Sequence, residues 1–418
     1  MKAVALVELP ILKPVRTFGI FEQSCPTECI AWDVCGGAET APCGCVWTEP
    51  ERRHQCRACH LVCRERNVDP RPGELPDSFR SQISAGRSLD DLTVSQPSDL
   101  SHFPIFIPTR TNALPRGTRL PLKWAAVSAR TLFTKHTSGP VEAKTYFTSP
   151  ERARAYTRVD ADTQLLAVLN AQDFTLEGFW GTRRSVFYKT LQHCGFAAAT
   201  GPTFSIITDP NEAPAAHNVC MLLRHHQVVH ELEATNLIAI PNLYWRDYRD
   251  RWQWGAWLAE QENVHFISRD FSRTRDRSTF LHELAGLIEI IKLSGKTFHV
   301  FLVGVGSQKA GMTLLHLDSV GCTASVVTGS PIIKAMFGGC ELKPRGAMPP
   351  DVVKNKTLPR KEIALRNLEI MEQFVLEVVS PLASYQDYRP LNNGLVGELN
   401  RRGGKTSRRK ANGGNLGG

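Results

Sequence analysis

The sequence predicts an α/β fold built on a parallel sheet. Short apolar runs recur along the second half of the chain, and each ends on small or polar residues. Several are separated by helix-compatible segments, and strands alternating with helices are typical of parallel sheets. Buried parallel strands read as continuous apolar runs. The runs begin roughly 25 to 40 residues apart, which fits one β-α unit each, and an eight-unit barrel takes about 250 residues. We therefore expect a TIM-barrel-like parallel sheet, whose closure the sequence leaves open.

Seven apolar runs are the candidate strands, and they are residues 103–108, 165–170, 195–207, 236–245, 264–271, 298–307 and 323–331. Residues 123–133 have a helix-compatible pattern. The eighth strand is either the apolar stretch 4–12 or is missing. The sheet would be complete only if that distant stretch joins it. Closure of the barrel is therefore not assured by the sequence.

The chain divides into five predicted regions. Residues 1–66 are a Cys-rich metal-binding module, and 67–101, rich in Pro, Asp, Ser and Arg, are a linker. The TIM-barrel-like domain takes residues 102–340. A helical extension covers 341–391, with a Pro- and Lys-rich connection up to 358 and a helix opened by Pro359. Residues 392–418 are a disordered basic tail that supplies much of the net charge of +9.

Residues 25–63 hold eight of the twelve cysteines, with spacings C-x3-C-x5-C, C-x-C and C-x2-C-x3-C. Eight thiolates suffice for two tetrahedral zinc sites or for iron–sulfur clusters. The Gly-, Pro- and Ala-rich residues between them cannot build a core, so a metal would hold this module together. We place zinc ahead, because the spacing matches no ferredoxin arrangement, and keep an iron–sulfur cluster as the alternative. The predicted ligands are Cys25, Cys29, Cys35, Cys43, Cys45, Cys56, Cys59 and Cys63.

Composition narrows the class of protein. At 42% hydrophobic residues the chain reads as globular, and it contains no apolar run of 18 or more residues, so we expect no membrane-spanning helix. Its first residues lack the basic region and the cleavage site of a secretory signal. We therefore expect a cytoplasmic protein, in which cysteines serve metal or redox chemistry and not disulfides.

Parallel α/β folds place their sites at the carboxyl ends of the strands. Asp173, Asp209 and Asp270 each follow an apolar run, where a carboxylate can act as nucleophile or as acid and base. Each can equally cap the next helix, and Pro210 makes that reading especially plausible for Asp209. Among these three we favour Asp173 for acid–base work and keep Asp270 as a second catalytic candidate.

Other strand-end residues are candidates for binding. Glycines in the motif GVGSQKAG let a backbone approach a ligand closely, and the following helix N-terminus favours an anion. We expect substrate contacts from Asn242, Trp245, Gly304, Gly306 and Gln308.

An aromatic and basic cluster follows the fourth run. Arg246 and Arg249 lie in it, interleaved with Trp and Tyr. Such interleaving can stack bases and bind phosphates, so DNA or RNA is the expected partner. Packing of the same aromatics into the core is the competing interpretation.

Two motifs carry a resemblance to a known superfamily. The segment FLVGVGSQKAGMTLLHLDSVGCTASVVTGSP resembles the late-barrel segment of tRNA-guanine transglycosylases. The run GPTFSIITDPN, with IAIPNLYWRD about 30 residues further on, is similar to phage and bacterial proteins of the deazapurine DNA-modification branch. The resemblance covers residues 103–338. It implies a TIM-barrel-like fold and exchange of a nucleobase of the 7-deazaguanine type in DNA or tRNA. A carboxylate nucleophile and a second carboxylate as acid and base would perform it.

The chain departs from that pattern in three places. The family's zinc site follows the barrel, whereas the cysteine cluster here precedes it, so the resemblance does not transfer the zinc. Cys322, Thr323 and Ser325 stand where the family has its nucleophilic aspartate, and the nearest carboxylate is Asp318, the third catalytic candidate. Thr203 stands where the phage branch has an aspartate.

Three hypotheses follow from these residues. The first is a base-exchanging transglycosylase. The second is a noncatalytic nucleic-acid-binding protein whose barrel has lost its nucleophile. The third is an iron–sulfur redox enzyme that uses the cysteine cluster.

Overall fold

The computed structural model describes residues 6–12, 85–98, 103–134, 142–180, 184–206, 215–246, 248–274, 276–386, 393 and 395. Within these ranges, eight strands form two parallel sheets of four strands each. They are β1 (Phe106–Pro108), β2 (Trp124–Ser128), β3 (Gln164–Val168), β4 (Phe196–Thr200), β5 (Ile238–Ile240), β6 (Phe266–Asp270), β7 (His299–Val303) and β8 (Thr323–Thr328). The predicted parallel α/β architecture is thereby confirmed.

One sheet has the order β1-β8-β7-β6 and the other β2-β3-β4-β5. Their outer strands face each other twice, β1 against β2 and β5 against β6. In the described residues no continuous ladder crosses either junction. A single isolated parallel bridge joins Thr109 to Ala126 at the first junction, and another joins Asn242 to Ser268 at the second.

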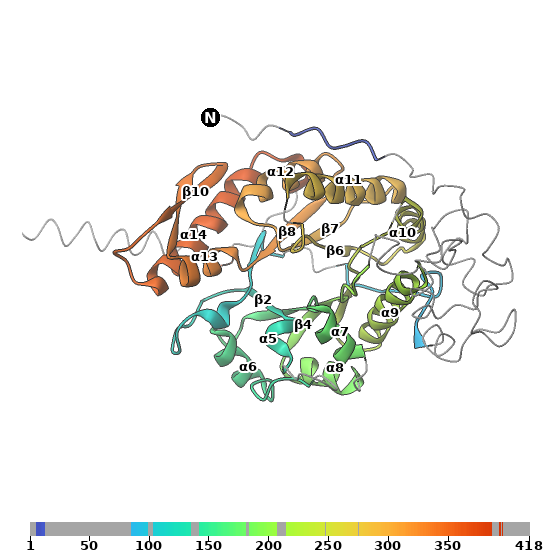
Figure 1. Cartoon of the computed structure of the whole chain (residues 1–418), viewed down its shortest axis with the longest axis horizontal. Coiled ribbons are helices and arrows are strands. Elements are labelled where there is room, and N and C mark those ends of the chain that lie inside the picture. The colour runs from blue at the N-terminus through green and yellow to red at the C-terminus, as the bar shows by residue number, and fades with distance from the viewer. Residues whose placement is uncertain are drawn as a thin grey trace, which may run out of the picture.

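Helices follow most of the strands and cover the outer faces of the sheets. In Figure 1, α10 to α13 accompany the half that contains β6 to β8, and α5 to α9 accompany the half with β2 and β4. They are α5 (Ala129–Leu132), α6 (Pro150–Thr157), α7 (Asp173–Trp180), α8 (Arg184–His193), α9 (Ala215–Glu233), α10 (Tyr248–Glu260), α11 (Arg277–Ser294), α12 (Ser307–Asp318) and α13 (Ser330–Gly338). A short 3₁₀ helix, η2 (Thr111–Ala113), follows β1. No helix of this described set is long and apolar enough to cross a membrane.

Capping residues explain where several of these helices begin and end. Asp276 precedes α11 and accepts a hydrogen bond from the amide of Thr279 at 2.7 Å, and Gly295 ends the helix in the left-handed conformation. Ser149 caps α6 in the same way, with Pro150 at the first helical position. Local sequence signals therefore set these boundaries.

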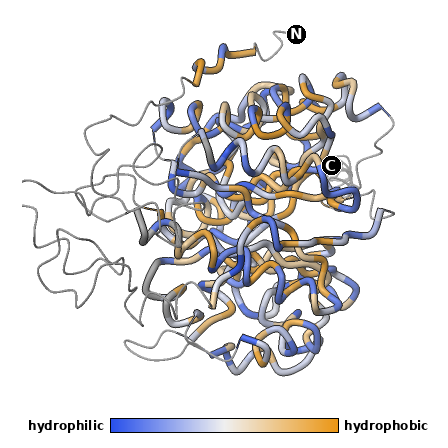
Figure 2. Tube along the Cα trace, turned by 90° about the vertical axis from the view of Figure 1, so that its right-hand side faces the viewer, coloured by the Kyte–Doolittle hydropathy of each residue, from blue (hydrophilic) through white to orange (hydrophobic). Residues whose placement is uncertain are grey.

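The side chains of the strands form two buried clusters. One lies between the strands and the helices that cover them. The other takes side chains from both sheets, including Ile107, Leu166, Ile240 and Phe301, together with Phe103 just before β1. Figure 2 shows apolar stretches running through the middle of the molecule and hydrophilic ones at its periphery. Strand side chains alternate between two faces. One face packs against the helices, and the other contributes to the apolar cluster that both sheets share.

Two amide side chains fill the junctions where the sheets meet. Gln96 lies between β5 and β6, where its Nε2 donates to the carbonyls of Ala239 and Phe266 and its Oε1 accepts from the amides of His265 and Phe266. Asn393 lies between β1 and β2 and bonds to Phe106 O and to both Trp124 N and O. Each amide thus replaces a peptide group of the missing ladder.

Those two residues belong to the segments predicted as linker and tail. The sequence assigns residues 67–101 to a linker and 392–418 to a disordered tail. Instead, Leu92, Val94 and Gln96 are buried in the fold, and so are Asn393 and Leu395. The remainder of the predicted tail and residues 67–84 lie outside the described residues, as do residues 1–5 and the eight predicted cysteine ligands.

The seven predicted runs match β1 and β3 to β8, with β3 beginning one residue before its run, but the prediction for the remaining strand was wrong. Residues 6–12 have no regular secondary structure, and the eighth strand is β2, in the segment 123–133 expected to be helical. Only its second half, α5, is helix. Strand β2 reads Trp-Ala-Ala-Val-Ser and is mostly buried, and its pairing with β3 along its whole length prevails over its helix-compatible pattern.

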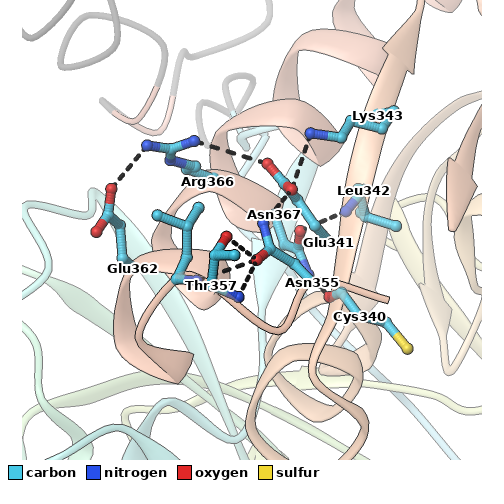
Figure 3. Close-up of polar contacts among 10 residues, drawn as sticks. Cys340, Glu341, Leu342, Lys343, Asn355, Thr357, Glu362, Arg366 and Asn367 are labelled. Carbon is cyan, nitrogen blue, oxygen red and sulfur yellow. Dashed lines mark hydrogen bonds and ion pairs between the residues drawn. The ribbon is translucent and has the colours of Figure 1, made fainter. Parts of the chain in front are cut away.

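After α13 the chain forms an antiparallel hairpin, β9 (Cys340–Arg345) and β10 (Met348–Lys354), where the sequence suggested only a connection. The predicted helix after Pro359 is confirmed as α14 (Arg360–Val379), followed by a 3₁₀ helix, η3 (Ala383–Tyr385). Asn367 of α14 holds the hairpin: its Oδ1 accepts from Leu342 N, and its Nδ2 donates to Cys340 O. Figure 3 shows Glu341 beside it, paired with Lys343 and Arg366.

Candidate functional site

The carboxyl end of β6 carries a carboxylate, Asp270, on the sheet that also contains β7, β8 and β1. Side chains of β6 alternate, so Phe266 and Ser268 face the shared interior while Arg269 faces α11 and pairs with Glu283. By the same alternation Asp270 points to the interior side at the strand's end. Its Oδ1 accepts from Ser272 N at 2.8 Å and its Oδ2 from Ser272 Oγ at 3.0 Å. The turn after β6 therefore fixes this carboxylate.

A chain of hydrogen bonds links the middle of β6 to residues that follow β5, β4 and β3. Ser268 Oγ donates to Asn242 Oδ1, Asn242 Nδ2 donates to Thr203 Oγ1 at 2.6 Å, and Thr203 Oγ1 donates to Asn170 Oδ1 at 2.9 Å. The Nδ2 of Asn170 is buried and has no acceptor among the described residues. Asn242, a predicted substrate contact, is fully buried and orients this network.

Arg273 crosses the same end of the strands. It lies in the loop after β6, and its Nη1 donates to Ser205 Oγ, after β4, at 2.5 Å. Its Nη2 donates to Ala171 O, after β3, at 3.2 Å. The side chain is exposed, so a cation lies at the surface between loops that follow three different strands.

A cavity of about 190 Å³ opens between the ends of β6 and β7 and the start of α12. Three predicted substrate contacts line it: Gly304, Gly306 and Gln308. Gly304 has φ +79°, and a Cβ there would lie 2.7 Å from the backbone of Ser272, so only glycine allows the two loops to meet. Gln308 Nε2 donates to Pro350 O of β10 at 3.3 Å.

Two lysines complete the lining of this cavity. Lys309 of α12 donates to Thr274 O at 2.9 Å and lies 4.4 Å above the ring of Phe280. Lys334 comes from α13. Burial lowers the pKa of both ammonium groups from their usual value. An anion in the cavity would compensate for the water that these charges have lost.

Other predicted contacts have structural roles instead. Trp245 is 7% exposed and lies under Arg269, whose guanidinium carbon is 4.1 Å from the ring centroid. Arg246 pairs with Asp250 at 2.6 Å, and both side chains are more than nine-tenths buried. The indole and this guanidinium are thus engaged inside the fold and not displayed to a nucleic acid.

The three predicted catalytic aspartates do not come together. Asp173 begins α7, five residues after β3 ends, at the same strand ends as Asp270, although its side chain lies outside the described residues. Asp318 ends α12, at the opposite end of the strands, where its Oδ1 accepts from Ser384 N and Ser384 Oγ. Geometry therefore separates Asp318 from the other two. Asp209 and the side chain of Arg249 also lie outside the described residues.

The surroundings of Ser325, one of the residues that the resemblance sets in the place of a nucleophile, are closed to a ligand. Ser325 of β8 is fully buried, and its Oγ donates to Pro104 O at 2.6 Å and contacts His299 Nε2 at 2.8 Å. His299 also contacts Thr323, and burial lowers its pKa to about 3, so the ring is neutral. The ring of Phe103 stacks on that imidazole, with 5.4 Å between the two ring centroids. These residues seal the amino ends of the strands.

Cysteines of the described residues are free thiols. Burial raises the pKa of Cys194, Cys220 and Cys322 to about 11, so they stay protonated and unreactive near neutral pH. Across the ranges that the structure describes, no group of three or more His, Cys, Asp or Glu side chains could hold a metal ion. The predicted zinc site falls outside those ranges.

Sequence reasoning missed several residues of this site, namely Asn170, Thr203, Arg273, Ser307, Lys309 and Lys334. Two signals were present. Asn170 and Thr203 follow apolar runs just as Asp270 does, and Ser307 and Lys309 belong to the glycine motif. Lys334 carried no signal, because α13 reaches the cavity only through the tertiary fold.

Comparison of the chain with family models, curated proteins and solved structures finds no match in any of the three. Function must therefore be argued from the residues at the strand ends.

Proposed function

We propose that this protein acts on nucleic acid at the carboxyl ends of its eight strands and exchanges a nucleobase, in the manner of guanine transglycosylases. The observation that carries the proposal is Asp270: a carboxylate held by Ser272, facing inward, beside a network of buried amides. Such a position is where parallel α/β enzymes keep their catalytic groups. The resemblance over residues 103–338 supplies the reaction class.

We further propose that the two sheets work as one TIM-barrel-like ring. Three features support this: the isolated bridges at both junctions, the apolar cluster shared by both sheets, and the amides of Gln96 and Asn393, which replace the missing ladder. A ring brings the ends of β3 and β6 to opposite sides of one mouth. A nucleobase could then lie between them.

In this proposal Asp270 is the nucleophile and Asp173 the acid and base. The Asp270 carboxylate attacks C1′ of the nucleoside, the C–N glycosidic bond breaks, and the departing base takes a proton from Asp173. The incoming base gives a proton back to Asp173, attacks C1′ and displaces the carboxylate. The unpartnered Nδ2 of Asn170 is a donor for a carbonyl oxygen of the base.

Incorporation of labelled guanine or a 7-deazaguanine into tRNA and into DNA tests the reaction. Wild-type protein is expected to incorporate label into one of the two, and Asp270→Asn to lower the rate by about 100-fold or more, as for loss of a catalytic proton-transfer or nucleophilic group. Asp318→Asn is the matched control, since the same change falls at the other end of the strands. Equal activity of the two variants would remove Asp270 from the mechanism.

A second candidate function is noncatalytic nucleic-acid binding. The sealed environment of Ser325 favours it, because the strand that carries the family's nucleophile offers no carboxylate to the mouth. The two candidates separate in one experiment. Salt-dependent binding of tRNA or DNA without incorporation of any base would select the noncatalytic function.

We also retain zinc as the proposed ligand of the eight cysteines at Cys25–Cys63, with an iron–sulfur cluster as the alternative. Metal analysis and an absorption spectrum of anaerobically purified protein distinguish them. About two zinc ions per chain and no colour support four-thiolate sites. Bound iron with sulfide would instead support the redox hypothesis.

A further inference from the structure

We propose that the cavity at the start of α12 binds the phosphate group of a nucleotide unit. This inference rests on the proposed function and names the part of the substrate that this corner of the site would hold. The evidence comes from one orphaned hydroxyl, from uncapped helix amides and from two lysines.

The first observation is Ser307 Oγ. Ser307 is 2% exposed, lines the cavity, and its hydroxyl has no hydrogen-bond partner among the described residues. A buried hydroxyl without a partner costs about 1–3 kcal/mol, and native proteins rarely keep such a group without a reason. A bound oxyanion would accept its hydrogen bond.

The second observation is that α12 begins without a side-chain cap. Its N-cap is Gly306, which offers no side chain to the first amides, and the first amides of a helix have no intrahelical acceptor. The conformation does not demand glycine there: φ is −83°, and an added Cβ would meet only Ser330 Oγ, at 3.9 Å. The amide of Lys309 donates to Gly306 O, so the missing side chain leaves the amides of Ser307 and Gln308 without a cap, where the helix dipole favours an anion.

The third observation is charge. Lys309 and Lys334 enter the cavity from two different helices, and no carboxylate is among the described residues that line it. Neither lysine forms an ion pair within the described residues, and Asp276, whose charge acts on Lys309, does not line the cavity. A phosphate has several oxygens that can accept from the hydroxyl, the helix amides and the two ammonium groups at once.

The cavity is also of suitable size and place. Its volume of about 190 Å³ is several times the roughly 30 Å³ that one water occupies in the liquid, so a tetrahedral oxyanion fits. Ser272 lines it and also binds both oxygens of Asp270. A phosphate bound here would hold the rest of the nucleotide beside that carboxylate.

Titration calorimetry on the whole chain, as purified, tests the inference. Inorganic phosphate, guanosine monophosphate and a short single-stranded oligonucleotide are the three probes. The wild type is expected to bind each of the three probes saturably. Tighter binding of the mononucleotide identifies a free nucleotide as the source of the phosphate, and tighter binding of the oligonucleotide identifies a strand.

Two variants and one control connect binding to this cavity. Ser307→Ala should weaken phosphate binding about 5- to 10-fold, as expected for one hydrogen bond to a charged group, and Lys334→Met by at least 10-fold. Lys292→Met, an exposed lysine near the end of α11, should change nothing. A purely structural Ser307 would behave differently, because its removal would lower the thermal midpoint, whereas loss of an orphaned hydroxyl should keep or raise it.

Absence of phosphate binding by the wild type would overturn the inference. So would an affinity for phosphate in Ser307→Ala and Lys334→Met that equals that of the wild type. Failure of the proposed function is separable. Phosphate bound in this cavity without base exchange leaves the inference standing and removes the transglycosylase reaction. Base exchange together with an unchanged affinity for phosphate in both variants would support the transglycosylase reaction and remove the inference.

Discussion

Gln96→Leu is expected to open the junction between β5 and β6. The substitution keeps nearly the same side-chain volume but removes both the donor and the acceptor. Gln96 is 4% exposed and makes hydrogen bonds of 2.6 to 2.9 Å with backbone groups of Ala239, His265 and Phe266. Leucine would leave two carbonyls and two amides without these partners in a buried place.

The expected cost follows from those four groups. Each buried polar group that loses its partner costs about 1–3 kcal/mol, so the lower bound is about 4 kcal/mol. The greater apolarity of leucine returns about 1 kcal/mol. We therefore expect the free energy of unfolding to fall by at least about 3 kcal/mol, which is a large part of the stability of an ordinary domain.

Equilibrium urea denaturation, followed by circular dichroism and tryptophan fluorescence, measures this change. Gln164→Leu is the matched control, because the same substitution falls on the exposed first residue of β3 and should change stability by less than about 0.5 kcal/mol. Hydrogen exchange localises the effect: peptides that contain His265 and Phe266 should lose protection. A loss of stability below 1 kcal/mol, or unchanged protection there, would refute the role given to Gln96.

Three further predictions concern other residues. Asn393→Leu should lower the free energy of unfolding by about 2 kcal/mol or more, measured by the same denaturation, since Trp124 and its neighbour strand lose the bridging amide. Burial holds the pKa of His299 at about 3, so between its unfolded value of about 6.5 and 3 only the unfolded chain takes up a proton. The stability that this neutral ring contributes is complete above pH 6.5 and decreases as the pH is lowered, by roughly 2 kcal/mol at pH 5. The free energy of unfolding of His299→Gln should therefore decrease by correspondingly less between pH 7 and pH 5. Gly304→Ala should cost about 2 kcal/mol or more through its left-handed backbone and the contact with the neighbouring loop at Ser272, while Gly306→Ala, which puts a poorer N-cap before α12 without a clash, should cost about 1 kcal/mol or less, as a thermal melt would show.

Strand positions could be read from the sequence because parallel strands are buried on both faces. The runs at 264–271 and 298–307 contain β6 and β7 for this reason. The segment 123–133 was misread because β2 passes directly into α5, so one short strand and one short helix share a single apolar stretch. Spacing within such a stretch fits both structures, and only pairing with β3 distinguishes them.

The candidate site was predicted where it depends on strand ends and missed where it depends on tertiary packing. Asp270 and Gly304 follow directly from the rule that sites lie at the carboxyl ends of strands. Trp245 was misinterpreted because an indole followed by arginines has the same pattern whether it stacks on a base or on its own Arg269. Lys334 reaches the cavity from a helix that follows the last strand, and no local pattern indicates such a contact.

Gln96 and Asn393 lie outside the segment that the sequence assigned to the barrel, yet each closes one junction between the sheets. The proposed ring and two independent sheets predict different effects when both junctions are opened. Sites that are far apart and independent change stability additively, within about 0.5 kcal/mol. In a ring, opening one junction leaves all eight strands connected through the other, whereas opening both separates the halves. The double variant Gln96→Leu with Asn393→Leu should therefore lose more stability than the two single variants together. Additive losses would mean that the sheets stand alone, and the proposal of one TIM-barrel-like ring would fail.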